Sequence, residues 1–344
     1  MERTMTTYQK IIHATRYARW READGRRETW PETVARYYDF MFSLPCAAEL
    51  GGDLRAELEL ATLNLDVMPS MRAMMTAGEA LRRDNAAAYN CSFVVVDNQI
   101  AFDEEMYLLM CGCGVGVSVE RQFVKSLPRI ADDHHPCEST IVVEDSRIGW
   151  SIAFRQLIAF LYGGNIPKID YSLVRPAGAP LKTFGGRASG PGPLRNLFEY
   201  TIRLFRSAQG RQLNSLECHD LCCKIGEIVV VGGVRRSALI SLSNLSDLRM
   251  RGAKDGHFWE EHPERAMANN SVAYTERPEL LVYMDEMVSM VRGRSGERGI
   301  FNREAAVRQA QRTGRRKVVR KFNDPVTEEE RELKIDFFTN PCGE

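Results

Sequence analysis

The residues at positions 340–344 combine three side chains whose types and spacing could do chemistry on one substrate. Asn340, Cys342 and Glu344 alternate with Pro341 and Gly343. In an extended segment, residues i, i+2 and i+4 lie on one side, while proline stiffens the approach and glycine permits a tight loop. An amide that binds a hydroxyl, a sulfur, and a carboxylate that can take a proton would then face a substrate together. Taken alone, the motif is more simply interpreted as a plain turn with a buried cysteine.

Cys91 is the second cysteine with a suggestive position. It opens a run of β-branched residues immediately after Tyr89 and Asn90. Strand ends in α/β folds point into ligand sites, so this sulfur is a candidate reactive group.

A third cysteine group, Cys218-His219-x-x-Cys222-Cys223, places Cys218 and Cys222 on one helix face at i and i+4. A zinc site normally needs four ligands, and a closing set would have to come from His134, His135 and Cys137. A buried apolar helix face explains the group more simply, and no metal site is predicted.

Three glycine-rich segments, 111–116, 182–193 and 231–237, stand between strand-like and helical stretches. Glycine lets backbone N–H groups approach a phosphate or a planar cofactor. None of the three matches a dinucleotide fingerprint or a Walker loop, so a tight turn is the simpler interpretation of each. Arg235 and Arg236 favour a phosphate role for the third segment, because paired guanidinium groups suit bidentate recognition.

The elements that must position these residues follow an α/β pattern. The first eighty or so residues carry helical signals, and short β-branched runs then alternate with longer helix-compatible segments, an order typical of parallel α/β units. The predicted strands are 91–96, 115–119, 166–174, 237–242 and 271–274, and the clearest predicted helices are 150–161 and 194–207. Periodicity does not decide between an open sheet and part of a barrel.

The composition of the chain indicates which classes of binding partner to expect. Its 344 residues are 44% hydrophobic and 27% charged, which predicts a globular chain with a sizeable core. Its 46 Lys and Arg balance 46 Asp and Glu, so neither a nucleic-acid polymer nor an anionic membrane is an expected partner. No signal peptide or membrane-spanning run is predicted, and nine irregularly spaced cysteines do not resemble a secreted disulfide framework. We therefore expect a cytoplasmic protein that binds small molecules.

The motifs, taken in order, closely resemble the adenosylcobalamin-dependent (class II) ribonucleotide reductases. The matching segments are NC at 90–91, GCGVGVSVE, RPAGAPLKTFGGRASGPGPL, KIGEIVVVGGVRRSALISLS, ANNSVAY, GERGIFN and TNPCGE. The opening YARWREADGRRETWPETVARYYDF resembles the ribonucleoside-triphosphate reductase branch. The resemblance covers nearly the whole chain but only the amino-terminal portion of such an enzyme.

The resemblance implies a fold and a set of catalytic roles. Residues 1–85 would be a helical N-terminal region, 86–338 the first, five-stranded half of the ten-stranded α/β barrel, and 339–344 the start of its finger loop. Cys342 would be the thiyl-radical cysteine that abstracts the substrate 3′ hydrogen. Glu344 would be the base for the 3′ hydroxyl, and Asn340 would hydrogen-bond the ribose. Cys91 would be one of two thiols that supply the reducing electrons.

The resemblance also implies ligands for the glycine segments. Gly112, Gly114 and Gly116 would lie on the adenosylcobalamin side. The loops around the substrate and a deoxynucleotide effector would contain Lys182, Gly185, Gly186, Arg187, Ser189, Gly232, Gly233, Arg235 and Arg236. The implied partners are a ribonucleoside tri- or diphosphate, thioredoxin or a similar dithiol, and either a second copy of the chain or a separately supplied C-terminal half.

Two features leave alternatives open. The second reducing cysteine and the second half-barrel of the family are absent from the sequence, so the chain resembles an incomplete reductase that we expect to be inactive alone. A class I large subunit that uses a separate metal-radical subunit, a catalytically inactive nucleotide-binding module and an unrelated zinc protein are the alternatives. The sequences of the segments TNPCGE and LKTFGGRASGP favour the cobalamin class.

Overall fold

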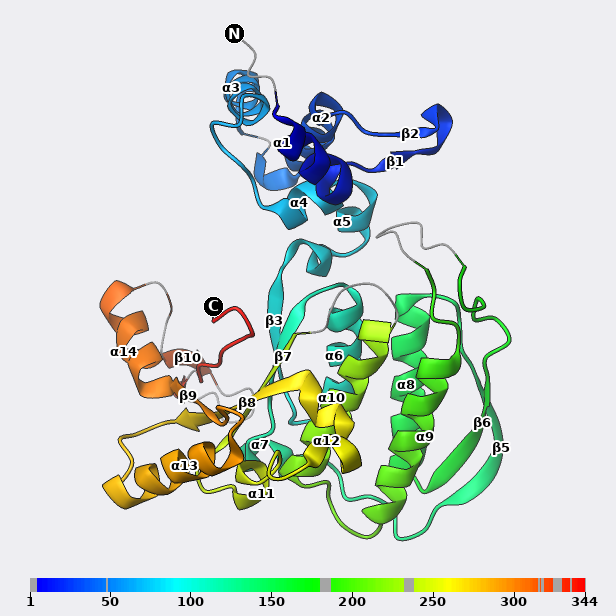
Figure 1. Ribbon diagram of the computed structural model, residues 1–344, viewed down its shortest axis with the longest axis vertical. Coiled ribbons are helices and arrows are strands. Elements are labelled where there is room, and N and C mark those ends of the chain that lie inside the picture. The colour runs from blue at the N-terminus through cyan, green and yellow to red at the C-terminus, as the bar shows by residue number, and fades with distance from the viewer. Residues whose placement is uncertain are drawn as a thin grey trace. The chain divides into compact units, whose positions relative to one another are not determined.

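The computed structural model describes residues 5–47, 49–179, 187–231, 238–314, 316, 319–323, 330–334 and 336–343. The chain forms two compact units, Met1–Asn90 and Cys91–Glu344 (Figure 1). Within the described residues, no helix is both long and apolar enough to cross a bilayer.

The first unit is helical. Its helices are α1 (Thr7–Ile12), a π-helical turn (His13–Tyr17), α2 (Trp30–Met41), α3 (Gly52–Leu63), α4 (Met71–Thr76) and α5 (Glu79–Arg83). Short 3₁₀ turns (Glu22–Asp24, Pro45–Ala47, Asn85–Ala88) and the antiparallel pair β1 (Trp20–Arg21) and β2 (Arg26–Arg27) connect them. Helix α2 begins at a capping box, in which Thr29 and Glu32 satisfy each other's backbone N–H groups. Its apolar face packs Trp30, Val34 and Tyr38 against Met74.

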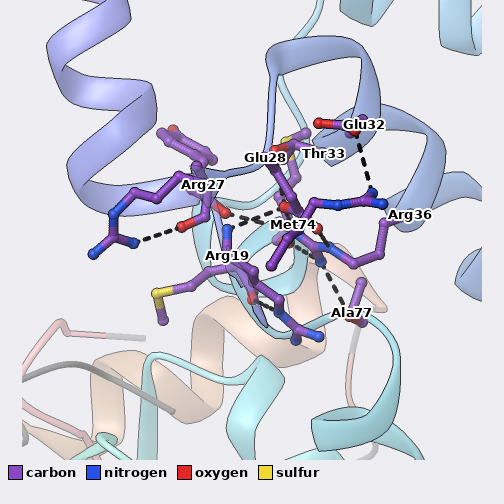
Figure 2. Close-up of polar contacts among 12 residues, drawn as sticks. Arg19, Arg27, Glu28, Glu32, Thr33, Arg36, Met74 and Ala77 are labelled. Atoms are coloured by element: carbon purple, nitrogen blue, oxygen red, sulfur yellow. Dashed lines mark hydrogen bonds and ion pairs between the residues drawn. The ribbon is translucent and has the colours of Figure 1, made fainter. Parts of the chain in front are cut away.

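A buried carboxylate joins the helices of this unit (Figure 2). Glu28 accepts hydrogen bonds from Arg36 at 2.7 and 2.9 Å and from the Thr33 hydroxyl at 3.1 Å. Arg36 also donates to the carbonyl oxygens of Met74 and Ala77, at 2.8 and 3.0 Å. One ion pair therefore connects the segment before α2 and the middle of α2 to the carboxy-terminal half of α4.

A five-stranded parallel sheet forms the centre of the second unit. Its strands, in spatial order, are β3 (Cys91–Val95), β4 (Gly114–Ser118), β7 (Leu239–Asn244), β8 (Ala268–Tyr274) and β9 (Gly299–Asn302). β4 is buried along its whole length, and its alternation of glycine and valine suits a strand covered on both faces. The predicted α/β class is confirmed.

Helices cover the sheet and make the crossovers between its strands. α6 (Ala101–Met110), α8 (Arg147–Tyr162), α9 (Gly192–Ser207) and α10 (Ser215–Val231) lie side by side (Figure 1). Their inner faces form the main core with the valines of β3 and β4. The helices predicted over 150–161 and 194–207 correspond to α8 and α9 and are confirmed.

One predicted sheet strand was wrong. Residues 165–170 form β6 (Asn165–Asp170), but β6 pairs with β5 (His135–Val142) in a separate two-stranded parallel sheet, and residues 171–174 are not a strand. The fifth strand of the central sheet is β9, which is only four residues long. A strand of that length carries too little alternation to be recognised by pattern.

The remaining elements of the second unit complete the chain. They are α7 (Arg121–Val124), α11 (Leu248–Arg251), α12 (Phe258–Glu261), a 3₁₀ turn (Pro263–Met267), α13 (Leu280–Gly293), α14 (Arg303–Thr313) and the antiparallel pair β10 (Val319–Asn323) and β11 (Glu330–Lys334). Residues 336–343 follow β11 and return to the central sheet, as the contacts below show.

Candidate active site

The pairing of β3 with β4 places Cys91 at the amino end of the sheet. Cys91 is the register partner of Gly114, and Phe93 is the partner of Gly116. Since side chains two residues apart in a strand share a face, Cys91 and Phe93 point to the same side of the sheet. The half-buried Cys91 therefore begins a face that continues through Phe93.

The segment that carries Cys342 lies across this face. A side chain at Gly114 would meet Pro341 Cγ at 3.3 Å and Cys91 Sγ at 3.4 Å. A side chain at Gly116 would overlap both the Thr339 carbonyl oxygen and the Phe93 ring. The ring of Phe338 stacks on that of Phe93, with centroids 4.5 Å apart. The structure thus brings the Cys342 motif and Cys91 together, although about 250 residues separate them in the sequence.

The motif itself forms a turn. The Asn340 carbonyl accepts the Gly343 N–H at 2.9 Å, and the Asn340 side-chain oxygen accepts the Cys342 N–H at 3.1 Å. Gly343 has a φ of +76°, which glycine adopts without strain. The predicted extended arrangement of this segment was wrong over 340–343, and Cys342 is exposed rather than buried. Glu344 lies outside the described residues, so its role as base stays a prediction.

The three glycines predicted on the cofactor side each have a local structural task. Gly112 ends α6 with a φ of +82° and donates its N–H to the Leu109 carbonyl at 2.8 Å. Gly114 and Gly116 give room to Pro341, Thr339 and Phe93. Contact with a cofactor stays a prediction for all three.

Replacing Gly116 with alanine is expected to lower the free energy of unfolding by about 1–3 kcal/mol, because the new methyl group forces the 337–341 segment away from β4. The matched control is Gly114→Ala, whose methyl group would meet its neighbours at 3.3–3.4 Å and needs only a small adjustment. Urea unfolding of both variants measures the difference. Equal stabilities would show that the segment does not lie on β4 as described.

Two residues that sequence reasoning missed hold this segment. Glu120 follows β4 and Arg303 begins α14, and they form a buried bidentate ion pair with distances of 3.0 and 2.6 Å. The Arg303 Nε–H donates to the Phe337 carbonyl at 2.7 Å. Both residues border quoted motifs, since Glu120 ends GCGVGVSVE and Arg303 follows GERGIFN, but nothing in the sequence indicates their pairing.

The predicted effector and substrate loops are described only in part. Arg187 donates to the Gly178 carbonyl at 2.9 Å. Ser189 lines a cavity of about 140 Å³ at the amino end of α8, together with Asp145, Arg147, Trp150 and Arg175. The other residues predicted for these loops lie outside the described residues: Lys182, Gly185, Gly186, Gly232, Gly233, Arg235 and Arg236.

The Cys218, Cys222 and Cys223 group lies on α10 and is buried. The only group of three potential metal ligands found among the described residues is a different one, Asp220, His262 and Glu264. Both carboxylate oxygens of Asp220 already accept hydrogen bonds from Arg265, at 2.8 and 2.7 Å, so this group does not favour a cation. The three cysteines thus lie on a buried helix face, as predicted.

A buried carboxyl group lies beside this helix face. Glu105 of α6 is 1% exposed, next to the Cys222 thiol of α10. Burial raises the pKa of Glu105 from 4.5 to about 8, although Cys222 and His219 partly oppose the shift. The folded state therefore favours the neutral acid at pH 7.

This raised pKa predicts a pH dependence of stability. The neutral Glu105 contributes fully to the free energy of unfolding below the unfolded pKa of 4.5. This contribution is lost as the pH rises towards the folded pKa of about 8. Glu105→Gln is expected to remove this loss, so that its stability relative to the unmodified protein rises by up to about 4 kcal/mol between pH 4.5 and 8. Urea unfolding at several pH values tests this, with Glu104→Gln on the exposed side of α6 as the control. Parallel pH profiles for Glu105→Gln and the unmodified protein would contradict the buried acid.

No family model matches the chain. The chain is 28% identical to the adenosylcobalamin-dependent ribonucleoside-triphosphate reductase of Levilactobacillus brevis, over 76% of this chain and 44% of that enzyme. The reductase of the same name from Lacticaseibacillus paracasei is 26% identical, over 97% of this chain and 52% of that enzyme. The fold is similar to the crystal structure of a B-12 dependent (class II) ribonucleotide reductase. The TM-score is 0.66 at 19% identity, covering 95% of this chain and 67% of that chain.

The chain is therefore similar in sequence to adenosylcobalamin-dependent ribonucleoside-triphosphate reductases and similar in fold to a class II ribonucleotide reductase. The predicted resemblance is thereby confirmed, and the α/β fold is that of a class II ribonucleotide reductase over the matched part. The chain spans about half the length of the class II reductases that it matches in sequence.

Proposed function

We propose that this chain forms the radical site of an adenosylcobalamin-dependent ribonucleotide reductase, which converts ribonucleoside tri- or diphosphates into 2′-deoxyribonucleotides. The observation that supports the proposal is the meeting of two sulfur-bearing segments at one glycine. Pro341, next to Cys342, and the Cys91 sulfur both lie within 3.4 Å of the side-chain position at Gly114. Two relatives named as adenosylcobalamin-dependent reductases support the same class.

The proposed roles follow from the chemistry of each group. A thiyl radical on Cys342 takes the hydrogen atom from C3′ of the ribose, and Glu344 accepts the 3′ hydroxyl proton. The 2′ hydroxyl then leaves as water, taking one proton from a pair of thiols, of which Cys91 is one. The same pair supplies the second hydrogen to C2′, gives up two electrons in total and becomes a disulfide, while Glu344 returns its proton to the 3′ oxygen. The hydrogen returns from Cys342 to C3′, and a dithiol such as thioredoxin reduces the disulfide.

Asn340 has a different task before substrate binds. Its side-chain oxygen accepts the Cys342 N–H, so it holds the turn that presents the sulfur. Its amide nitrogen can donate to a ribose hydroxyl without breaking that bond, because an amide side chain carries both an acceptor and two donors.

The exposed thiol of Cys342 fits a large cofactor, since access to the sulfur is open. Adenosylcobalamin, when bound, supplies the radical through homolysis of its cobalt–carbon bond. Gly112, Gly114 and Gly116 remain the residues that we propose for the cofactor side; of these, Gly114 lies beside the Cys91 sulfur and Pro341, and Gly116 beside Thr339. Their backbone would border the cofactor without contributing a side chain.

We also propose that the cavity beside Ser189 takes part in binding a deoxynucleotide effector. Arg147 and Trp150 line it with a positive charge and an aromatic face at the amino end of a 16-residue helix, and Arg175 lines it as the partner of Asp145, to which it donates at 2.7 Å. Helix amino ends favour anions such as phosphate. The cytoplasmic location and the oligomeric state stay predictions from the sequence.

The decisive experiment measures deoxynucleotide formation by the protein produced from its complete coding sequence, with a ribonucleoside triphosphate and a dithiol reductant. We expect product only when adenosylcobalamin is added. Product that instead requires a separate metal-radical subunit would place the chain in class I. Nucleotide binding without product under any of these conditions would support the regulatory alternative.

A further inference from the structure

Each carboxylate oxygen of Glu120 accepts a hydrogen bond from Arg303 and a second one from a neighbouring side chain. Glu120 also accepts from the Ser118 hydroxyl at 2.8 Å and from the Gln122 amide at 2.9 Å. Glu120 is 1% exposed and Arg303 is 5% exposed. Because the carboxylate is fully paired by neighbours on its own strand and turn, it holds the guanidinium in one orientation.

Arg303 uses its remaining groups on the segment that leads to Cys342. Its Nε–H donates to the Phe337 carbonyl at 2.7 Å. Its guanidinium lies over the Phe338 ring, 5.0 Å from the centroid. A planar guanidinium can serve a carboxylate, a carbonyl and an aromatic face together, which a lysine ammonium cannot.

Successive residues of the 338–341 segment contact successive positions of β3 and β4, from the Arg303 end to the cysteines. Phe338 stacks on Phe93, and Thr339 lies against Gly116. Pro341 reaches Gly114, the partner of Cys91. The segment therefore runs antiparallel to β3, and fixing its Phe337–Phe338 end fixes how far Cys342 lies along the strand.

We propose that Arg303 is a positioning residue that holds the Cys342 thiol beside the Cys91 thiol, with Glu120 as its fixed anchor. The functional meaning of this inference rests on the proposed reductase reaction, in which both thiols act on one ribose. The geometric claim concerns only the two sulfurs, and it can be tested without nucleotide or cobalamin.

The test is the rate at which a short bifunctional methanethiosulfonate joins Cys342 to Cys91, measured by mass spectrometry of the purified chain. The background carries Cys46→Ser and Cys137→Ser, so the five other cysteines that remain are buried ones. A monofunctional reagent measures the separate reactivity of each thiol. Circular dichroism and thermal melting establish that each variant is folded at the temperature of the assay.

We expect Arg303→Met to slow cross-linking by at least about tenfold, because the released segment no longer holds both thiols in one geometry. Arg303→Lys should restore part of the rate, since it keeps a charge for Glu120 but loses the planar fork. The matched control is Arg308→Met on the same helix, whose ion pair with Glu304 is exposed. This control should cross-link at the unmodified rate.

A folded Arg303→Met protein that cross-links within about twofold of the unmodified rate would overturn the proposal, because its role would then be structural only. If Arg303→Met does not fold, the cross-linking rate of Phe338→Leu tests the proposal instead. It removes the stacking on Phe93 while leaving the Glu120 pair, and we expect slower cross-linking, whereas an unchanged rate would again overturn the proposal. Failure of the reductase assay would leave these results unaffected, so the two proposals can fail separately.

Discussion

Replacing Cys342 with serine is expected to abolish deoxynucleotide formation by the protein produced from its complete coding sequence, with a loss of at least about 10³-fold. Serine has nearly the same size, and Cys342 is exposed, so the turn held by Asn340 should survive. A hydroxyl, however, does not form a radical that exchanges hydrogen with a ribose carbon as a thiol does. The loss should therefore fall on the rate of turnover and leave nucleotide binding unchanged.

The control for this substitution is Cys137→Ser. Cys137 lies on β5, in the separate two-stranded sheet, and is half-buried. We expect its activity to equal that of the unmodified protein. Turnover by Cys342→Ser within about tenfold of the unmodified rate would show that another group carries the radical.

Replacing Cys91 with serine is the second substitution with a large expected effect. Net reduction should fall by at least about 10²-fold, because in the proposed reaction the two electrons come from a thiol pair that includes Cys91. The hydrogen abstraction by Cys342 should remain, since Pro341 and Gly114 still hold the turn in place. The product assay combined with a measurement of hydrogen exchange at C3′ separates the two steps.

The control for Cys91→Ser is Cys46→Ser, which changes an exposed cysteine in the helical unit. It should leave both net reduction and hydrogen exchange unchanged. A Cys91→Ser variant that still forms deoxynucleotide over many turnovers would mean that the reducing thiols lie elsewhere.

Four of the five central strands, β3, β4, β7 and β8, were recognisable from the sequence, and Cys91 and Cys342 stood out as candidates, because these signals are local. Cys91 opens a β-branched run, and Cys342 lies in a short motif of chemically distinct residues. The helices α8 and α9 were equally clear, since each carries apolar residues over four turns.

What could not be predicted depends on contacts between distant parts of the chain. Glu120 and Arg303 are 183 residues apart, and neither residue type nor spacing links them. The need for glycine at position 116 comes from Thr339, which only the folded chain brings close. The strand at 165–170 was recognised, but its partner is β5, because pairing is decided by tertiary packing and not by the strand's own sequence.

The conformation of residues 340–343 was also not predicted from the sequence. The alternation of Asn340 and Cys342 suggested an extended segment, but Gly343 adopts a left-handed conformation and the Asn340 side chain bonds to the backbone two residues on. Asparagine and glycine favour such local turns over extension. The result presents the Cys342 sulfur at an exposed bend instead of on a flat strand face.

The most direct test of the central claim, that Cys342 is the radical cysteine beside Cys91, is tritium release from a [3′-³H] ribonucleoside triphosphate in the presence of adenosylcobalamin. We expect the Cys91→Ser protein to release tritium to solvent and the double variant that also carries Cys342→Ser to release none. Release that persists without the Cys342 thiol, or that is absent when only Cys91 is replaced, would contradict it.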